Sequence, residues 1–238
     1  MGLTISYQLR LPGTTTDDQA VALLERLRVH AVELSVEFAT PVLLFTGAML
    51  SAPEDADARN SVEWWLRVFA EGVREDRDGV AGPVDDAERL AFAAFMMTVG
   101  EGSEPAAFGL VRPLVDSAPT REGTTGNWQD WFWQGFCKTQ YASAVSDDHF
   151  VQCHLAVVRM LEEAERIGFD VTVHDEGFYW ETRSTERLLL EVRKMNRIMA
   201  RLAGALHDAL PADRTLEAAI FEHPDFEHLE MERGDPPL

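Results

Sequence analysis

A strict alternation of apolar and polar side chains opens the chain and constrains its fold more than any other feature. Between residues 3 and 11 every odd position is apolar and every even position is polar. A period of two predicts a β-strand with one buried face and one face toward water. We therefore predict a sheet strand at 3–11.

The residues after this strand predict a helix and then a second strand. Thr16 and Gln19 have the spacing of a capping box, which marks the start of a helix. The apolar pattern that follows is helical over 20–31, and a strand interrupted by Pro41 is predicted over 36–45. The opening fifty residues thus predict strand, helix, strand.

The same order of elements recurs later in the chain. Residues 131–141 alternate, 150–164 carry a helical apolar pattern that ends at Gly168, and 169–173 alternate again. Two strand-helix-strand units predict a single α+β domain with an antiparallel or mixed sheet on which the helices pack. We expect about six to nine strands and about three helices, within ordinary sheet sizes.

The central stretch leaves strand and helix open at 61–71 and 90–99. Residues 61–71 alternate like a strand, yet the spacing of Val62 and Leu66 suits a helix almost as well, and we favour the strand. The apolar runs at 90–99 and 106–111 predict two buried strands joined by a loop. The remaining polar segments are predicted surface loops, none of them an interdomain linker: 53–60, 75–86 and 117–127.

Residues 184–210 form the clearest predicted element, a long C-terminal amphipathic helix. Its apolar positions step by four, three, four, three and four: Leu188, Val192, Met195, Met199, Leu202 and Leu206. Five basic and three acidic residues give this segment a net charge of +2, whereas residues 212–238, with eight acidic residues and two arginines, carry −6. Either this acidic C-terminal tail lies along the cationic face of the helix, or that face receives an anionic ligand or an acidic partner.

The charge balance argues against two classes of partner. Asp plus Glu number 41 against 21 for Lys plus Arg, a formal net charge of −20 with a pI near 4.6. Such a surface repels phosphate backbones and anionic lipids, so we expect no nucleic acid and no membrane as partner. No segment approaches the roughly 20 apolar residues of a membrane helix.

Two further features predict a cytoplasmic protein. Residues 1–12 lack the basic start and the apolar block of a signal peptide. Cys137 and Cys153 are too few for a disulfide scaffold, so we expect a reducing compartment.

Motifs that would carry known chemistry are incomplete. The glycine-rich residues 100–104 lack the third glycine of a dinucleotide site and the Gly-Lys-Ser/Thr ending of a P-loop. The histidines at 174, 223 and 228 match no metal motif, so we expect no metal and no cofactor. A Cys–His nucleophile would need His154 as its base, but a histidine on an apolar helix face is more often a hydrogen-bonded core residue.

Residues 131–141 carry large side chains on both faces of the predicted strand. One face holds Trp131, Trp133, Cys137 and Tyr141, and the other holds Phe132, Gln134, Phe136, Lys138 and Gln140. We therefore expect both faces to be covered. The lysine then extends to solvent, pairs with a carboxylate or lines a pocket, and extension to solvent is the simpler interpretation.

The loop at 174–183 gathers acidic and aromatic side chains at the end of a predicted strand, where folds often place functional residues. A buried carboxylate there could act in acid–base chemistry. The simpler interpretation is an acidic turn whose aromatic side chains cap the core.

The candidate ligand-binding residues come from these two stretches: Lys138, Gln140, Asp175, Glu176, Tyr179, Trp180, Glu181 and Arg183. We expect first a non-enzymatic module that binds a small molecule or a protein, with aromatic anchors at 128–133 and 178–180, and a homodimer stays open.

The alternative is an enzyme of unknown reaction with a pocket between the 131–141 strand and the 174–183 loop. In it Lys138 orients the substrate and Glu176 or Glu181 moves a proton. The two functions differ in geometry, because a pocket should bring Lys138 within reach of a carboxylate of the loop.

Overall fold

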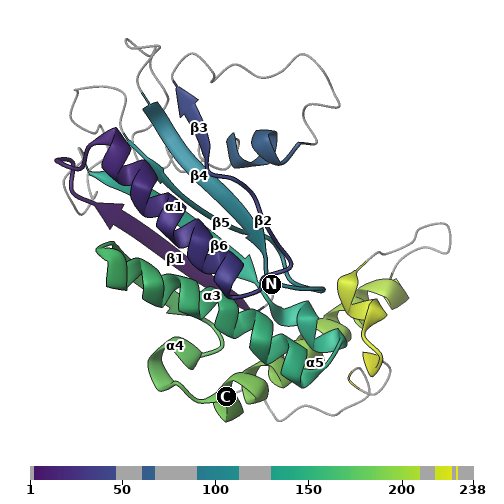
Figure 1. Cartoon of the computed structure of the whole chain (residues 1–238). Coiled ribbons are helices and arrows are strands. Elements are labelled where there is room, and N and C mark those ends of the chain that lie inside the picture. The colour runs from purple at the N-terminus through teal and green to yellow at the C-terminus, as the bar shows by residue number, and fades with distance from the viewer. Residues whose placement is uncertain are drawn as a thin grey trace, which may run out of the picture.

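The structure, a computed structural model, describes residues 3–46, 61–67, 90–112, 130–209, 218–226 and 229 (Figure 1). Besides a short helix at 62–67, its elements follow in the order β1 (Thr4–Leu11), α1 (Asp17–Glu33), β2 (Phe38–Ala39), β3 (Leu43–Thr46), β4 (Leu90–Thr98), β5 (Ala106–Val111), β6 (Trp131–Lys138), the 3₁₀ helix η3 (Gln140–Ala144), α3 (Asp147–Ile167), β7 (Asp170–Asp175), α4 (Tyr179–Thr182), α5 (Thr185–Ala209) and the 3₁₀ helix η4 (Ala219–Glu222).

The strands form one antiparallel sheet, and the predicted α+β class agrees with this architecture. Among the described residues the sheet has seven strands in the order β2-β4-β5-β6-β1-β7, and β3 also pairs with β4. β1 lies between β6 and β7 and is antiparallel to both. The residues that end β6 and β7 therefore lie at the same end of the sheet, on either side of the start of β1.

The first strand and the two helices that cover the sheet follow their local patterns. The odd residues of β1 are buried and the even ones half-buried, as the alternation predicts. Thr16 and Gln19 form the predicted capping box of α1, and α3 ends at Gly168 in a left-handed conformation with φ of 109°. Figure 1 shows α1 and α3 side by side over one face of the sheet.

The strand predicted at 131–141 is shorter, and its second face is less covered than expected. β6 ends at Lys138, and residues 140–144 form η3, where the Gln140 side chain is buried and accepts the backbone N–H of Leu3. Trp131 and Trp133 are buried, but Gln134 is exposed and Phe136 keeps 45% of its surface accessible. Only one face of β6 is therefore sealed.

Side chains of β1 and β6 add hydrogen bonds to the backbone of β5. β5 and β6 share one registered pair, Val111 with Phe132. Further along, the carbonyl of Ala107 accepts hydrogen bonds from the Tyr7 hydroxyl (2.7 Å) and from the Trp133 indole N–H (2.8 Å). The backbone acceptor thus stays satisfied inside the core, as burial requires.

The strand favoured at 61–71 is wrong for the residues that the structure describes. Residues 62–67 are helical, and Ser61 Oγ accepts the N–H of Trp64 as a helix cap does. One turn of helix suffices to bury Leu66. Residues 68–71 and the predicted loops 53–60, 75–86 and 117–127 lie outside the described part of the chain.

The apolar runs after residue 90 do form strands. β4 and β5 are joined by a turn in which Ser103 N–H donates to Gly100 O, and Gly102 has φ of 76°. The glycine-rich residues 100–104 are therefore a hairpin turn.

α5 lies where the long helix was predicted, but its buried stripe turns away from the predicted one. The stripe begins at Leu188 and Val192 as expected and continues through small and polar residues: Asn196, Ala200, Ala203 and Gly204. Leu202 and Leu206 are exposed instead. Ile220 of η4 is fully buried against Ala200 and Ala203, so the described part of the acidic tail docks through apolar contact.

Two basic residues of α5 form ion pairs within the helix itself. Arg187 and Lys194 both pair with Glu191, at 2.7 and 3.2 Å. None of the helices in the described part of the chain combines the length and hydropathy that a membrane crossing requires.

We predict that Gly135→Ala destabilises the protein by roughly 1–3 kcal/mol, the usual cost of overpacking a core. A methyl group at residue 135 would lie 2.5 Å from the ring of Tyr7. That ring cannot swing aside without breaking its hydrogen bond to Ala107. Urea unfolding measures the effect, and Gln134→Ala, at the exposed neighbouring position, should change stability by less than about 0.5 kcal/mol. Equal stability of Gly135→Ala and the wild type would contradict this packing.

Candidate functional site

Three segments meet at a buried histidine at the common end of β6 and β7. Thr139 follows β6, His154 projects from α3 and Asp175 ends β7. The Thr139 hydroxyl lies 3.0 Å from His154 Nδ1, and His154 Nε2 lies 3.2 Å from Asp175 Oδ2. All three residues are buried. We call these residues the His154 network.

The carboxylate of Asp175 is the acceptor on which this network ends. Its Oδ1 accepts the backbone N–H of Gly177 (2.7 Å), and its Oδ2 accepts the backbone N–H of Trp180 (2.9 Å). Burial by itself raises the pKa of Asp175, but the hydrogen bond and attraction of His154, together with the two backbone N–H groups, outweigh it, so the pKa is lowered. Asp175 is thus a buried anion that organises the segment after it.

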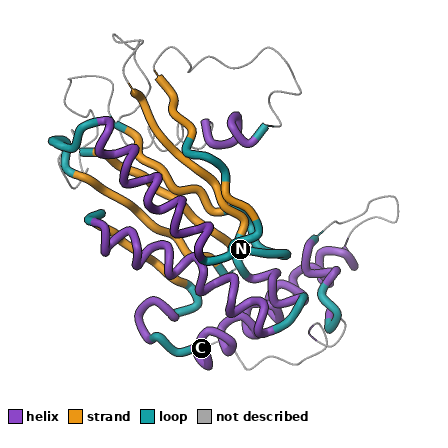
Figure 2. The backbone as a smooth tube through the Cα atoms, in the orientation of Figure 1, coloured by secondary structure: helices purple, strands orange, loops and turns teal. Residues whose placement is uncertain are grey.

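That segment is held in an unusual backbone conformation. Phe178 and Arg183, on either side of α4, have φ of 57° and 56°, in the left-handed region that side-chain-bearing residues rarely adopt. The backbone N–H of Trp180, between them, is the group that Asp175 binds. Figure 2 shows this segment at the edge of the molecule, and it contacts both β7 and α5.

Two aromatic side chains of this segment each pack against an arginine, and Trp180, one of the two, is half-buried. The guanidinium of Arg187 lies 5.0 Å from the ring centre of Phe178, and that of Arg183 lies 4.7 Å from the ring centre of Trp180. Arg183 also pairs with Glu162 of α3 at 2.6 Å. Phe178 keeps 43% of its surface accessible. We call Phe178, Trp180, Arg183 and Arg187 the aromatic–arginine patch.

The structure brings the two predicted stretches together but distributes their residues over different contacts. Lys138 and Glu176 flank Thr4 on opposite sides, since Thr4 pairs with Lys138 in register and its N–H donates to Glu176 Oε2 at 2.8 Å. The ammonium of Lys138 pairs with Glu104 at 2.9 Å. Its ion-pair partner is therefore in the β4–β5 turn, not in the 174–183 loop as the enzyme alternative expects.

The other candidate residues divide between interior and surface. Gln140 is fully buried and bonds to Asn196 of α5. Tyr179 is half-buried, with its ring centre 6.4 Å from that of His154, and Glu181 is exposed. Neither Thr139 nor Asn196 was predicted from the sequence as a site residue. Asn196 could have been noticed, because it stands four residues after Val192 and so lies on the same buried face of α5.

The order hydroxyl, imidazole, carboxylate in the His154 network matches the hydrogen-bond order of a hydrolase triad. A nucleophile must reach its substrate, however, and the Thr139 side chain is fully buried. The network can therefore orient and stabilise these three segments, but a substrate has no access to its hydroxyl. His154 is the hydrogen-bonded core histidine that the simpler interpretation predicts.

Neither cysteine has an activated thiol. Burial raises the pKa of Cys137 well above its usual range, and the nearby Glu104 adds to this shift. Burial also raises the pKa of Cys153, against a lowering hydrogen bond from Ser103. His149 Nε2 lies 3.5 Å from Cys153 Sγ, but its proton is donated to the carbonyl of Glu101 at 2.9 Å, so this nitrogen is no base for the thiol.

Within the described residues, no group of three or more His, Cys, Asp and Glu side chains is placed to hold a metal ion. Comparisons with protein families, with curated proteins and with solved structures find no match to this chain.

We predict that Asp175→Asn lowers the free energy of unfolding by about 1–3 kcal/mol, because an amide nitrogen would face N–H donors that now have an acceptor. Denaturant unfolding at neutral pH measures the change. Asp170→Asn, at the exposed start of the same strand, is the matched control and should stay within about 0.5 kcal/mol of the wild type.

The same variant tests the charge of Asp175. Because the folded pKa lies below the unfolded value of about 3.9, the stabilisation is present above that pH and is lost as the pH falls through the folded pKa. The stability difference between the wild type and Asp175→Asn should therefore shrink below about pH 4. A difference that stays constant from acid to neutral pH would show that the charge contributes nothing.

We also predict that both thiols of the native protein resist alkylation by iodoacetamide at neutral pH, because the thiolate is the reactive form and burial disfavours it. Mass spectrometry of the modified protein counts the adducts, and the urea-unfolded chain should take up two. Rapid modification of either cysteine in the native protein would contradict the burial described above.

Proposed function

We propose that this protein is a non-enzymatic binding module that recognises a protein partner through the aromatic–arginine patch. The observation that carries the proposal is a group of paired aromatic and arginine side chains, exposed except for the half-buried Trp180, beside a backbone segment that a buried anion holds. Trp and Arg are among the residue types that supply most of the binding energy in protein interfaces.

The rigidity of the patch favours binding, since flexible groups lose entropy when a partner immobilises them. Asp175 holds the segment from within through the N–H groups of Gly177 and Trp180. From outside, the ion pair between Arg183 and Glu162 ties the segment to α3. The backbone of the segment is therefore already ordered in the free protein, so binding would cost less conformational entropy.

The reactive groups of the described chain support a binding role over catalysis. His154 and Asp175 are buried in a closed network, and burial raises the pKa of both thiols. Lys138 is engaged with Glu104. The proposal includes the cytoplasmic setting expected from the sequence, and a second copy of the chain is one candidate partner.

The test compares three purified baits in affinity capture from a lysate of the source organism: the wild type, a patch variant and a matched control. The patch variant is Phe178→Asn with Arg187→Ala, since asparagine tolerates the left-handed backbone at residue 178. The control is Val29→Ala with Val32→Ala, which changes exposed apolar residues of α1. A partner should be captured by the wild type and the control and lost with the patch variant.

The partner so identified is then purified, and its Kd is measured with the three proteins. Loss of two anchoring side chains should weaken binding roughly 30-fold, the equivalent of about 2 kcal/mol. Analytical ultracentrifugation applies the same comparison to self-association. Proteins captured equally by all three baits, or equal Kd values for the patch variant and the control, would refute the proposal.

A further inference from the structure

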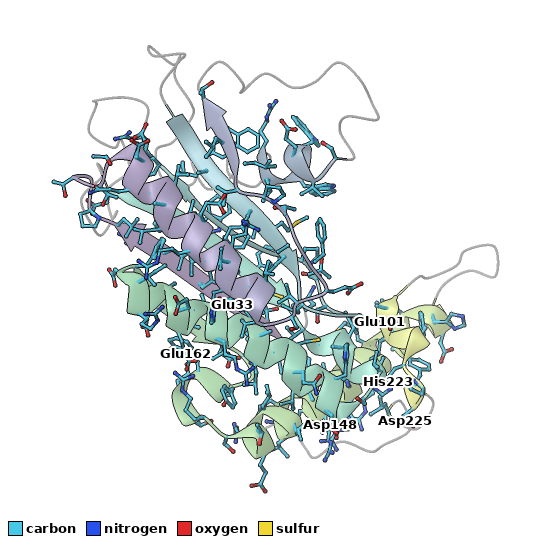
Figure 3. All side chains as sticks on the ribbon, in the orientation of Figure 1. Glu33, Glu101, Asp148, Glu162, His223 and Asp225 are labelled. Carbon is cyan, nitrogen blue, oxygen red and sulfur yellow. The ribbon has the colours of Figure 1, made fainter. Side chains whose placement is uncertain are left out.

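A second surface, separate from the aromatic–arginine patch, is a cleft of about 480 Å³ between the start of α3, the middle of α5 and the residues after η4. Its volume lies in the usual range for small-molecule sites. Figure 3 labels His223 and Asp225 at this end of the molecule, near Asp148 in the first turn of α3. Its polar lining includes Asp147, Arg193, Asn196, Arg197, His223 and Asp225.

A relay of two buried amides decides which atom Asn196 presents to the cleft. The backbone N–H of Leu3 can only donate, so the Gln140 atom that it contacts at 2.9 Å is the carbonyl oxygen. Gln140 Nε2 therefore donates to Asn196 Oδ1, also at 2.9 Å. The Nδ2 group of Asn196 is consequently the one that faces the cleft.

Only one of the two Nδ2 protons has a good acceptor. Nδ2 donates to Ser143 Oγ at 2.9 Å, and Ser143 in turn donates its own proton to the carbonyl of Gln140 at 2.6 Å. The other polar contact of Asn196 Nδ2 is with His223 Nε2, and the two nitrogens are 3.4 Å apart. Whether this contact is a hydrogen bond depends on the tautomer of His223.

The backbone assigns that tautomer. The N–H of Asp225 donates to His223 Nδ1 at 3.2 Å, so Nδ1 is unprotonated and the ring proton of the neutral histidine is on Nε2. Burial lowers the pKa of His223, against the opposing effects of Asp225 and Asp147, which agrees with a neutral ring. Two N–H groups, on Asn196 Nδ2 and His223 Nε2, therefore lie side by side 3.4 Å apart, and neither nitrogen can accept from the other.

These two neighbouring donors need an acceptor, and the arginines of the same cleft can add charge-assisted bonds to it. Arg193 and Arg197 line the same wall, four residues apart on α5. Arg193 already binds a carboxylate here, that of Asp147 at 2.5 Å. Asp225 is the other carboxylate of the lining. An anionic oxygen is the group that these donors would bind most strongly.

We propose that this cleft binds a small oxyanion ligand, a carboxylate or a phosphate, one oxygen of which accepts from both Asn196 Nδ2 and His223 Nε2. Arg193 exchanges its contact with Asp147 for the ligand or shares it. This proposal is independent of the aromatic–arginine patch, so one of the two binding sites can be refuted without affecting the other.

The experiment titrates the full-length ¹⁵N-labelled protein with sodium succinate and, separately, sodium phosphate at constant ionic strength. Saturable shifts are expected for the Asn196 side-chain amide and for the ring nitrogens of His223. The pKa of His223 should also rise in the presence of the anion, because an anionic acceptor stabilises the protonated ring. Saturation by succinate alone identifies a carboxylate site, and saturation by phosphate alone identifies a phosphate site.

Variants separate this site from general charge effects. His223→Ala and Arg193→Gln should each weaken binding of the effective anion roughly tenfold, the loss of one charge-assisted contact. His174→Ala, an exposed histidine on β7, is the matched control and should bind as the wild type does.

A further variant puts the missing acceptor into the protein itself. In Asn196→Asp a carboxylate oxygen would accept the His223 proton, so anion binding should be lost and the pKa of His223 should rise without ligand. The amide signals of α5 report that the fold is intact. Equal shifts with sodium chloride, saturation by choline, or undiminished binding in Asn196→Asp and His223→Ala would overturn the proposal.

Discussion

The carboxylate of Asp175 is the interaction on which this end of the molecule depends. It is an anion closed off from water, and it accepts from the His154 ring and from the backbone N–H groups of Gly177 and Trp180. A buried charge is tolerated only when it is paired and hydrogen-bonded, so these donors have to converge on it. Their convergence sets the path of the chain between β7 and α5, with its two left-handed residues.

The same requirement explains the polar residue within the buried stripe of α5. Asn196 is only 4% exposed, and each of its contacts belongs to a relay that begins at the backbone of Leu3 and ends at the cleft. Buried polar groups without partners cost free energy, so the relay restricts how α5, η3 and β1 can pack together. Both proposed binding surfaces are consequences of interior polar groups that had to find partners.

The sequence predicted elements well wherever one face of an element is buried by neighbours that repeat along it. β1, α1, α3 and the first half of α5 follow their patterns, because the period of the apolar residues reflects local backbone geometry. The prediction failed at 62–67, where a strand and a helix give similar spacings. It failed again in the second half of α5, where Ile220 selects the small residues Ala200 and Ala203 as its contact surface.

In the candidate site, too, some features could be predicted from the local sequence and others could not. From local sequence alone, the loop at 174–183 stood out by its acidic and aromatic residues, and His154 by its place on an apolar helix face. Only the tertiary structure showed that Thr139, His154 and Asp175 form one hydrogen-bonded network. It also showed that Lys138 forms an ion pair with Glu104, and that Leu3 donates a hydrogen bond to Gln140, 137 residues away. Periodicity records which face of an element is buried, since that depends on near neighbours in the chain. Which polar groups meet depends on how strands pair and helices pack, and no local pattern encodes those long-range contacts.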